Sequence, residues 1–291
     1  MNPGLLGLIA ALCWGVGDFA ARFTSRAIGP MQTLMMMAAV SAMALTPLAL
    51  KGNIALLWET ETLALTVVGA LTTTLAGVLL FKSLAQGPLG LVVPVTSSYP
   101  VPLVLVVMLM GELTLTIALA LAIAATIGGV WVVARAGRHV QYHDDHARGS
   151  VVHSMLLAGA AAVIFAIAIL LTHSAVSRAG EAEVLWLSRI IGFVALGVVL
   201  LIKGNAFSAL SLRMTLLLAA MGVVDVIGFL ALFTAQGAGD TAIASVASAA
   251  YGVVTVGLGR VVLKEPVKPL QWFGFAMVVA GAATLTLLSS Q

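Results

Sequence analysis

Two aspartates lie inside long apolar segments of this 291-residue sequence, where an ionisable side chain is energetically costly. Asp225 is at the middle of the apolar stretch 214–235, with no basic residue within two helical turns of it along the chain. Asp18 is near the end of the stretch 4–21, one helical turn after Trp14. A carboxyl group in such a position can carry a proton or bind the ammonium group of a solute. We predict that Asp225 and Asp18 both bind substrate and couple its movement to protons.

Each aspartate also has a purely structural interpretation. Asp18 is close enough to the end of its segment to pair with Arg22 or Arg26 in the same helix. Asp225 could form a hydrogen bond to a neighbouring helix. Arg189 lies inside another apolar stretch, where it could contact a substrate carboxylate, Asp225, or a lipid phosphate beside the interfacial Trp186.

Hydroxyl-bearing residues in two further apolar segments form neutral polar surfaces. The first segment, 89–110, contains three prolines, which free backbone carbonyls inside a helix. In the second, 241–263, the hydroxyls are spaced three, three and four residues apart, which places them on one helical face. The residues are Ser97, Ser98 and Tyr99 in the first segment and Ser245, Ser248, Tyr251 and Thr255 in the second. We predict that they line a solute-binding site together with Trp14; the alternative is that the small residues only permit close helix packing.

These two segments belong to a duplicated passage, 81–112 and 233–265. Each copy has an Ala-Gln-Gly sequence near its start, a tyrosine near its middle and a glutamate at its end. Corresponding residues are 150 to 153 positions apart: Gln86 and Gln236, Tyr99 and Tyr251, Glu112 and Glu265. The chain therefore contains an internal repeat of about half its length.

The composition predicts an all-α integral membrane protein, because 61% of the residues are hydrophobic and only 9% are charged. A hydrocarbon core of about 30 Å needs about 20 apolar residues per helix. The predicted spans are 4–21, 31–50, 62–81, 89–110, 114–134, 151–172, 184–202, 214–235, 241–263 and 270–288. Residues 1–134 form the first five-helix repeat, 135–150 a linker and 151–291 the second repeat. Since five is odd, the second repeat crosses the membrane in the opposite sense, which makes an inverted repeat of ten transmembrane helices with a binding site between its halves.

The loop charges are strongly asymmetric. Eleven lysines and arginines fall in loops on one predicted side, against two or three on the other. The positive-inside rule would then place both termini outside.

The excess of basic residues is too dispersed for nucleic-acid binding. His139, His143 and His146 in the linker have spacings that could ligate a metal, but the composition is typical of a solvated linker, so we predict neither metal nor cofactor.

Several short motifs resemble the EamA repeat of the drug/metabolite transporter superfamily. They are Cys13-Trp14-Gly15, Tyr99-Pro100-Val101, Gly111-Glu112 and Gly128-Gly129-Val130 in the first copy, and Tyr251-Gly252-Val253, Lys264-Glu265 and the glycine-rich 274–282 in the second. One departure is Gly252, where the family pattern usually has proline.

The resemblance implies a secondary transporter, not an enzyme, that moves a small organic solute through the cell (inner) membrane by alternating access. Export of an amino acid is the main interpretation, with drug or lipophilic-cation efflux as the alternative and a membrane-embedded enzyme as a weaker one. The resemblance also implies cytoplasmic termini, opposite to the loop charges. Small residues along 118–129 and 274–283 allow either sealing of each half or a dimer contact, so we predict a monomer or weak homodimer.

Overall fold

The computed structural model describes residues 3–111, 115–137, 146–204, 210–237, 250–265 and 267–289, and within them every regular element is helical. The elements are α1 (Pro3–Ile28), α2 (Pro30–Ala49), the short 3₁₀ helix η1 (Ile54–Trp58), α3 (Thr60–Gln86), α4 (Leu89–Thr96), α5 (Pro100–Leu109), α6 (Ile117–Gly137), α7 (His146–Ala179), α8 (Glu181–Ile202), α9 (Leu212–Gly237), α11 (Tyr251–Val262) and α12 (Pro269–Ser289). The all-α prediction is confirmed for these residues.

Eight segments of the described chain are long and apolar enough to cross a membrane, and two shorter apolar helices, Tyr251–Val262 and Pro269–Leu285, accompany them. Many large apolar side chains are exposed on the outer surface of the bundle, which suits contact with lipid. The predicted ninth span, 241–263, lies partly outside the described residues, so the count of ten spans stays a prediction.

The predicted fourth span is divided into two helices. The chain turns at Ser97, Ser98 and Tyr99, where backbone bonds such as Tyr99 N–H to Thr96 O (3.1 Å) tighten the last turn of α4. Pro100 then begins α5, because a proline needs no hydrogen-bond acceptor at the first position of a helix. The single helix predicted over 89–110 is therefore interrupted at its hydroxyl-rich part.

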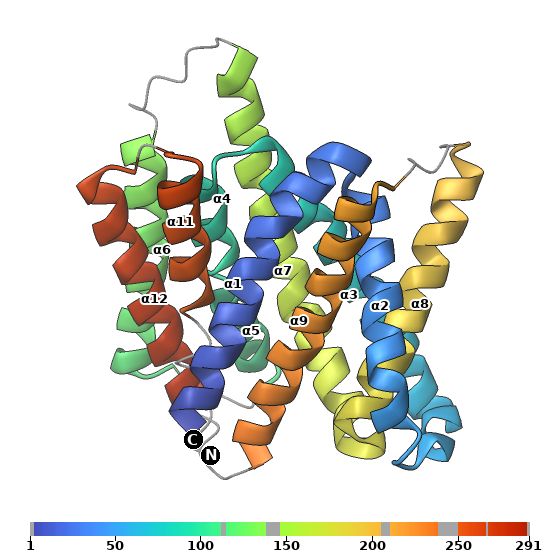
Figure 1. Cartoon of the computed structure of the whole chain (residues 1–291). Coiled ribbons are helices and arrows are strands. Elements are labelled where there is room, and N and C mark those ends of the chain that lie inside the picture. The colour runs from blue at the N-terminus through green and yellow to red at the C-terminus, as the bar shows by residue number, and fades with distance from the viewer. Residues whose placement is uncertain are drawn as a thin grey trace.

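The two repeats run in opposite directions. Gly29, which joins α1 to α2, and Gly180, which joins α7 to α8, both have positive φ angles, 86° and 91°, and lie 151 positions apart in the sequence. In Figure 1, α1 begins and α12 ends at the same end of the molecule, whereas α7, the counterpart of α1, begins at the opposite end. The described helices thus show the inverted arrangement.

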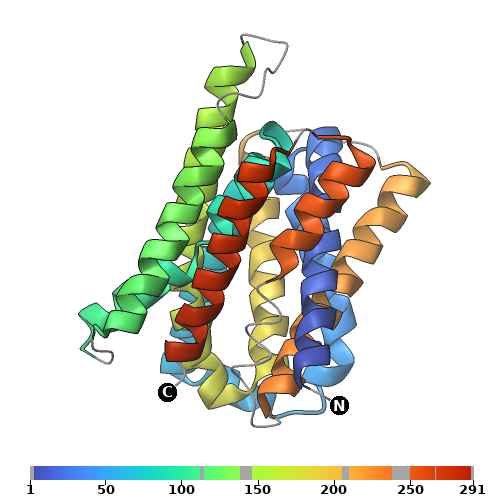
Figure 2. The same cartoon turned by 90° about the vertical axis from the view of Figure 1, so that its left-hand side faces the viewer.

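Helix contacts follow the same pseudo-twofold relation. Packing of α3 against α7 has its counterpart in packing of α1 against α9, while α2 packs on α8 and α6 on α12. Figure 2 shows α6 and α12 side by side along one edge of the bundle. Consequently the predicted site residues come from both repeats. Trp14 and Asp18 lie on α1 and Ser97 to Tyr99 between α4 and α5, while Asp225 lies on α9 and Tyr251 on α11.

Basic side chains gather at the end of the bundle opposite to the start of α1, which we call the cation-rich end. Its described members are Arg22, Arg26, Lys82, Arg135, Lys203, Arg213, Arg260, Lys264 and Lys268. The opposite end carries Glu59, Glu61, Glu181 and Glu183. Helices α6 and α7 extend into the range predicted as a linker, to Gly137 and from His146, and the predicted linker histidines His139 and His143 lie outside the described residues.

Candidate functional site

An ion pair joins α8 and α9 in the interior of the bundle. Arg189 Nη2 lies 2.8 Å from Asp225 Oδ2, and the two side chains are only 14% and 13% exposed. Ser41 Oγ of α2 lies 3.2 Å from the same carboxylate oxygen and 3.1 Å from the carbonyl of Gly222. The contact between Arg189 and Asp225, one of three considered for Arg189 from the sequence, is therefore present. Three helices from both repeats converge on one carboxylate.

A glycine in α9 allows this convergence. A Cβ atom at Gly222 would lie 2.6 Å from Cβ of Val40 and 3.0 Å from the carbonyl oxygen of Met37, so no larger residue fits between α2 and α9. Because the backbones of α2 and α9 approach closely at this point, Ser41 lies within hydrogen-bond distance of Asp225. The sequence alone gave no reason to select Ser41, because a single serine in an apolar helix usually serves packing.

An aromatic pair lies beside the ion pair. The guanidinium of Arg189 stacks over the ring of Phe229 at 5.3 Å, within the range of a cation–π interaction. Trp14 of α1 meets Phe229 edge to face, with ring centroids 5.2 Å apart. Gly228 makes room for this contact, since a Cβ there would lie 2.9 Å from Trp14 Nε1. Phe229 thus links Trp14 to the guanidinium of Arg189, and the role of Trp14 in solute binding stays a prediction.

Asp18 is partly buried and forms no hydrogen bond or ion pair with the part of the chain that the structure describes. It interacts electrostatically with Asp225 of α9 and with Tyr251 of α11. The alternative that Asp18 pairs with Arg22 or Arg26 is wrong, because Arg22 pairs with Glu265 and Arg26 donates to the carbonyl of Ala85. Asp18 is therefore a carboxyl group with no ion-pair partner among the described residues, within electrostatic range of Asp225 and Tyr251.

The hydroxyl residues of the broken helix have different surroundings. Ser97 is buried beside α11, and Tyr251 interacts electrostatically with Tyr99. Ser98 Oγ donates to the carbonyl of Val95 within its own turn, at 2.7 Å. Ser245 and Ser248 lie outside the described residues.

Thr255 contributes to helix packing. Its hydroxyl donates to the carbonyl of Gly15 in α1 at 3.1 Å, where α1 and α11 approach closely. A Cβ at Gly15 would lie 2.5 Å from Cβ of Val254, so this approach also depends on a glycine. The contact is the packing alternative considered for this face of the segment, and it is present at Thr255.

The close approach of α11 to the end of α4 depends on Gly252, and this dependence can be tested by substitution. A Cβ at this position would lie 2.8 Å from Ser97 Oγ and 2.9 Å from Cζ of Phe275. Gly252→Ala is expected to lower stability by about 1–3 kcal/mol through overpacking. Gly257→Ala in the same helix meets nothing within 4 Å and is the matched control, with unchanged or slightly raised stability. Thermal unfolding in detergent measures both, and equal midpoints would contradict the packing described.

Comparison with known proteins agrees with this architecture. The EamA-like transporter family matches residues 2–135 and 153–287, one match in each repeat. No curated protein matches the chain. Among the chains of solved structures that match, one superposes with a TM-score of 0.69 at 18% identity, covering 99% of this chain and 97% of its own, which shows a shared fold. The resemblance inferred from the motifs is confirmed, and the chain belongs to the EamA-like transporter family of multi-pass membrane transporters, within the drug/metabolite transporter superfamily.

Proposed function

We propose that this transporter exports a zwitterionic amino acid, with Arg189 and Asp225 as the charged pair that recognises it. The observation that supports this substrate is the Arg189–Asp225 ion pair itself, held between helices of both repeats. An amino acid carries the same two opposite charges, so its carboxylate can take the place of Asp225 on Arg189 while its ammonium group binds the freed carboxylate. The exchange keeps each charge compensated, as a poorly solvated site requires.

Asp18 is assigned a different role, as the proton-coupling carboxyl group. It interacts electrostatically with Asp225 and Tyr251 and has no cationic partner among the described residues, so its charge is free to change during the cycle. The protonated carboxyl would suit the state without substrate, and the ionised carboxyl would add a second anion for the substrate ammonium. Trp14, Ser97, Tyr99 and Tyr251 would supply the neutral lining; Ser98, Ser245 and Ser248 complete the predicted set.

The ten predicted spans and the inverted repeat suggest how the protein works in the membrane. We propose alternating access between the two ends of the bundle, in the cell inner membrane, with a monomer or weak homodimer as the working unit. The positive-inside rule assigns the cation-rich end to the cytoplasm, in contrast to the usual orientation implied by the family resemblance. Labelling of a tag on the N-terminus in intact cells distinguishes the two orientations.

Efflux of a lipophilic cation is the second candidate, favoured by the aromatic pair Trp14 and Phe229 beside the carboxylate of Asp225. In that case Arg189 would hold Asp225 only in the empty state. A permanently charged lipophilic cation, which has no carboxylate, separates this function from amino acid export.

The proposed function is tested by counterflow in proteoliposomes loaded with a panel of amino acids and, separately, with a lipophilic cation. We expect the proteoliposomes to take up a labelled neutral amino acid. Unlabelled neutral amino acid inside the vesicles should stimulate this uptake. With Asp18→Asn, counterflow should persist while accumulation driven by a pH gradient is lost. Glu61→Gln, which changes an exposed carboxylate at the end of the bundle, is the control and should behave as wild type. Movement of the lipophilic cation alone would contradict amino acid export.

A further inference from the structure

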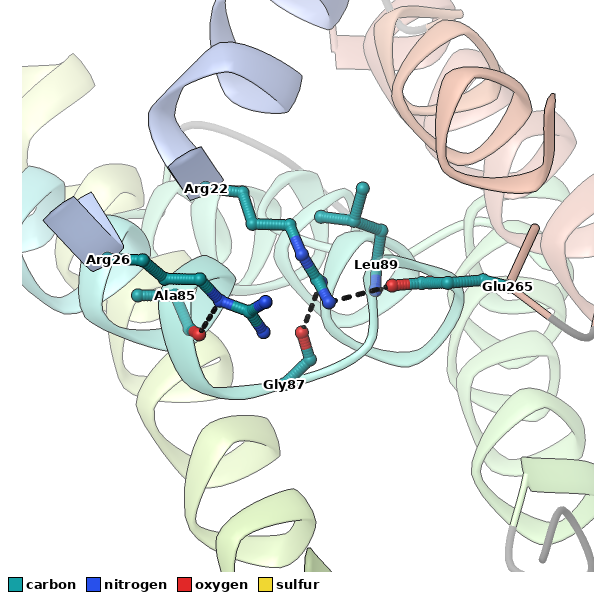
Figure 3. Close-up of polar contacts among 6 residues, drawn as sticks. All are labelled: Arg22, Arg26, Ala85, Gly87, Leu89 and Glu265. Carbon is teal, nitrogen blue, oxygen red and sulfur yellow. Dashed lines mark hydrogen bonds and ion pairs between the residues drawn. The ribbon is translucent and has the colours of Figure 1, made fainter. Parts of the chain in front are cut away.

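A buried network of charges ties three helices together at the cation-rich end (Figure 3). Arg22 Nη2 of α1 lies 3.0 Å from Glu265 Oε1, just beyond α11, and Arg22 Nη1 donates to the carbonyl of Gly87 at 2.6 Å. The other oxygen of Glu265 accepts the backbone N–H of Leu89 at 2.9 Å. The side chains of Arg22 and Glu265 are only 10% and 13% exposed.

Side chains from other parts of the chain cap the backbone groups at the corner between α3 and α4. Helix α3 ends at Gln86 and α4 begins at Leu89, so carbonyls at the end of α3 and N–H groups at the start of α4 lack partners within their helices. Arginines from α1 bind the carbonyls, Arg22 at Gly87 and Arg26 at Ala85, while the carboxylate of Glu265 binds the N–H of Leu89. Each charge has the sign that the adjoining helix dipole favours.

A turn in the backbone after α11 places Glu265 next to the start of α4. Lys264 has φ = 56° and is the only non-glycine residue with positive φ in the described part of the chain. This turn lets Glu265 N–H bond to the carbonyl of Gly259 at 3.2 Å and directs the side chain back toward α4. Such a conformation costs of order 1 kcal/mol in a residue with a Cβ, so it indicates a constrained position.

The network joins the two repeats, because α1, α3 and α4 belong to the first and Glu265 to the second. The offset of 151 positions between Gly29 and Gly180 makes His173 of α7 the counterpart of Arg22. His173 is exposed, and the ion pair near it, Arg178 with Glu61, is 44% and 66% exposed. The described ion pairs near the two ends of the bundle therefore differ in exposure: Arg22–Glu265 at the cation-rich end is buried, whereas Arg178–Glu61 at the opposite end is exposed.

We propose that Arg22 and Glu265 form a latch that closes the cation-rich end and separates each time the transporter opens there. This inference rests on the alternating access of the proposed function. A buried pair contributes little net stability compared with apolar packing, whereas removal of one partner leaves the other charge uncompensated. Such a contact is suited to a switch between two states, since opening the end to water would hydrate both charges when they separate.

Accessibility of a reporter cysteine tests the latch without any substrate. The single native cysteine is changed by Cys13→Ser, and Ser25→Cys is introduced on α1, where Ser25 is buried one turn beyond Arg22. The rate of labelling by a membrane-impermeant maleimide in proteoliposomes is measured with Arg22 or Glu265 altered. We expect slow labelling with the latch intact and labelling about tenfold faster or more in Arg22→Gln and in Glu265→Gln, with Arg22→Lys in between.

Matched controls separate opening from general loosening. Lys203→Cys, exposed at the same end, should be labelled at the same rate in every background, and Glu61→Gln should not affect Ser25→Cys. Size-exclusion profiles confirm that each variant is folded, and Glu265→Gln keeps an acceptor for the Leu89 N–H.

Unchanged labelling of Ser25→Cys in folded Arg22→Gln and Glu265→Gln would overturn the latch. Faster labelling of Ser25→Cys in these variants, in a protein that transports no amino acid, would support the latch and rule out an amino acid as the substrate. Unchanged labelling in a protein that does move amino acids would overturn the latch and leave the proposed function standing.

Discussion

Asp225→Ala is expected to abolish amino acid counterflow and to lower the free energy of unfolding by about 3–5 kcal/mol. The substitution leaves the guanidinium of Arg189, 14% exposed, without its carboxylate in the interior of the bundle. Phe229 provides only a cation–π contact, which does not replace an ion pair. Transport is lost because the group proposed to receive the substrate ammonium is absent.

The double variant Asp225→Ala with Arg189→Ala distinguishes binding from folding. Removal of both charges should recover much of the lost stability, since no buried charge remains unpaired, but it should not recover counterflow. Glu61→Ala, at the exposed pair with Arg178, should change stability by no more than about 1 kcal/mol and leave counterflow intact. Wild-type counterflow in the double variant would show that the pair has only a structural role.

Gly129→Ala is expected to separate α6 from α12 and to lower stability by at least about 2 kcal/mol. A Cβ at Gly129 would lie 2.5 Å from the carbonyl oxygen of Gly274 and 2.8 Å from the backbone nitrogen of Val278. Both contacts are with backbone atoms of a facing helix, so they can be relieved only by moving the helix. In a membrane, where close packing between helices replaces the hydrophobic effect, such a shift removes most of the contact.

The neighbouring glycine supplies the control for this prediction. A Cβ at Gly128 would meet only Cε of Met277, at 3.5 Å, which is ordinary contact with a flexible side chain. Gly128→Ala should therefore be neutral or stabilise the helix by up to about 1 kcal/mol. Thermal unfolding of both variants in detergent is the measurement. Equal unfolding midpoints would contradict the close approach of α6 and α12.

The helices and their arrangement in two repeats could be predicted from the sequence because they depend on local and periodic properties. Apolar length determines a membrane helix, as backbone groups in lipid must bond within their own segment. The duplication of residues 81–112 in 233–265 indicated the inverted repeat, since five spans is an odd number. The division of the predicted span 89–110 into α4 and α5 was not predicted, although its prolines indicated that helical hydrogen bonds are lost there.

The partners of the charged residues were decided only by the tertiary structure. Helical spacing favoured a pair between Asp18 and Arg22, but the uncapped corner of α3 and α4 and the carboxylate of Glu265, 243 positions away, hold Arg22 instead. Ser41 reaches Asp225 across 184 positions only because Gly222 lets α2 and α9 approach. A buried charge takes the partner that packing brings within about 3 Å, and the packing of α1, α2, α8, α9 and α11 depends on contacts between helices that no local pattern in the sequence records.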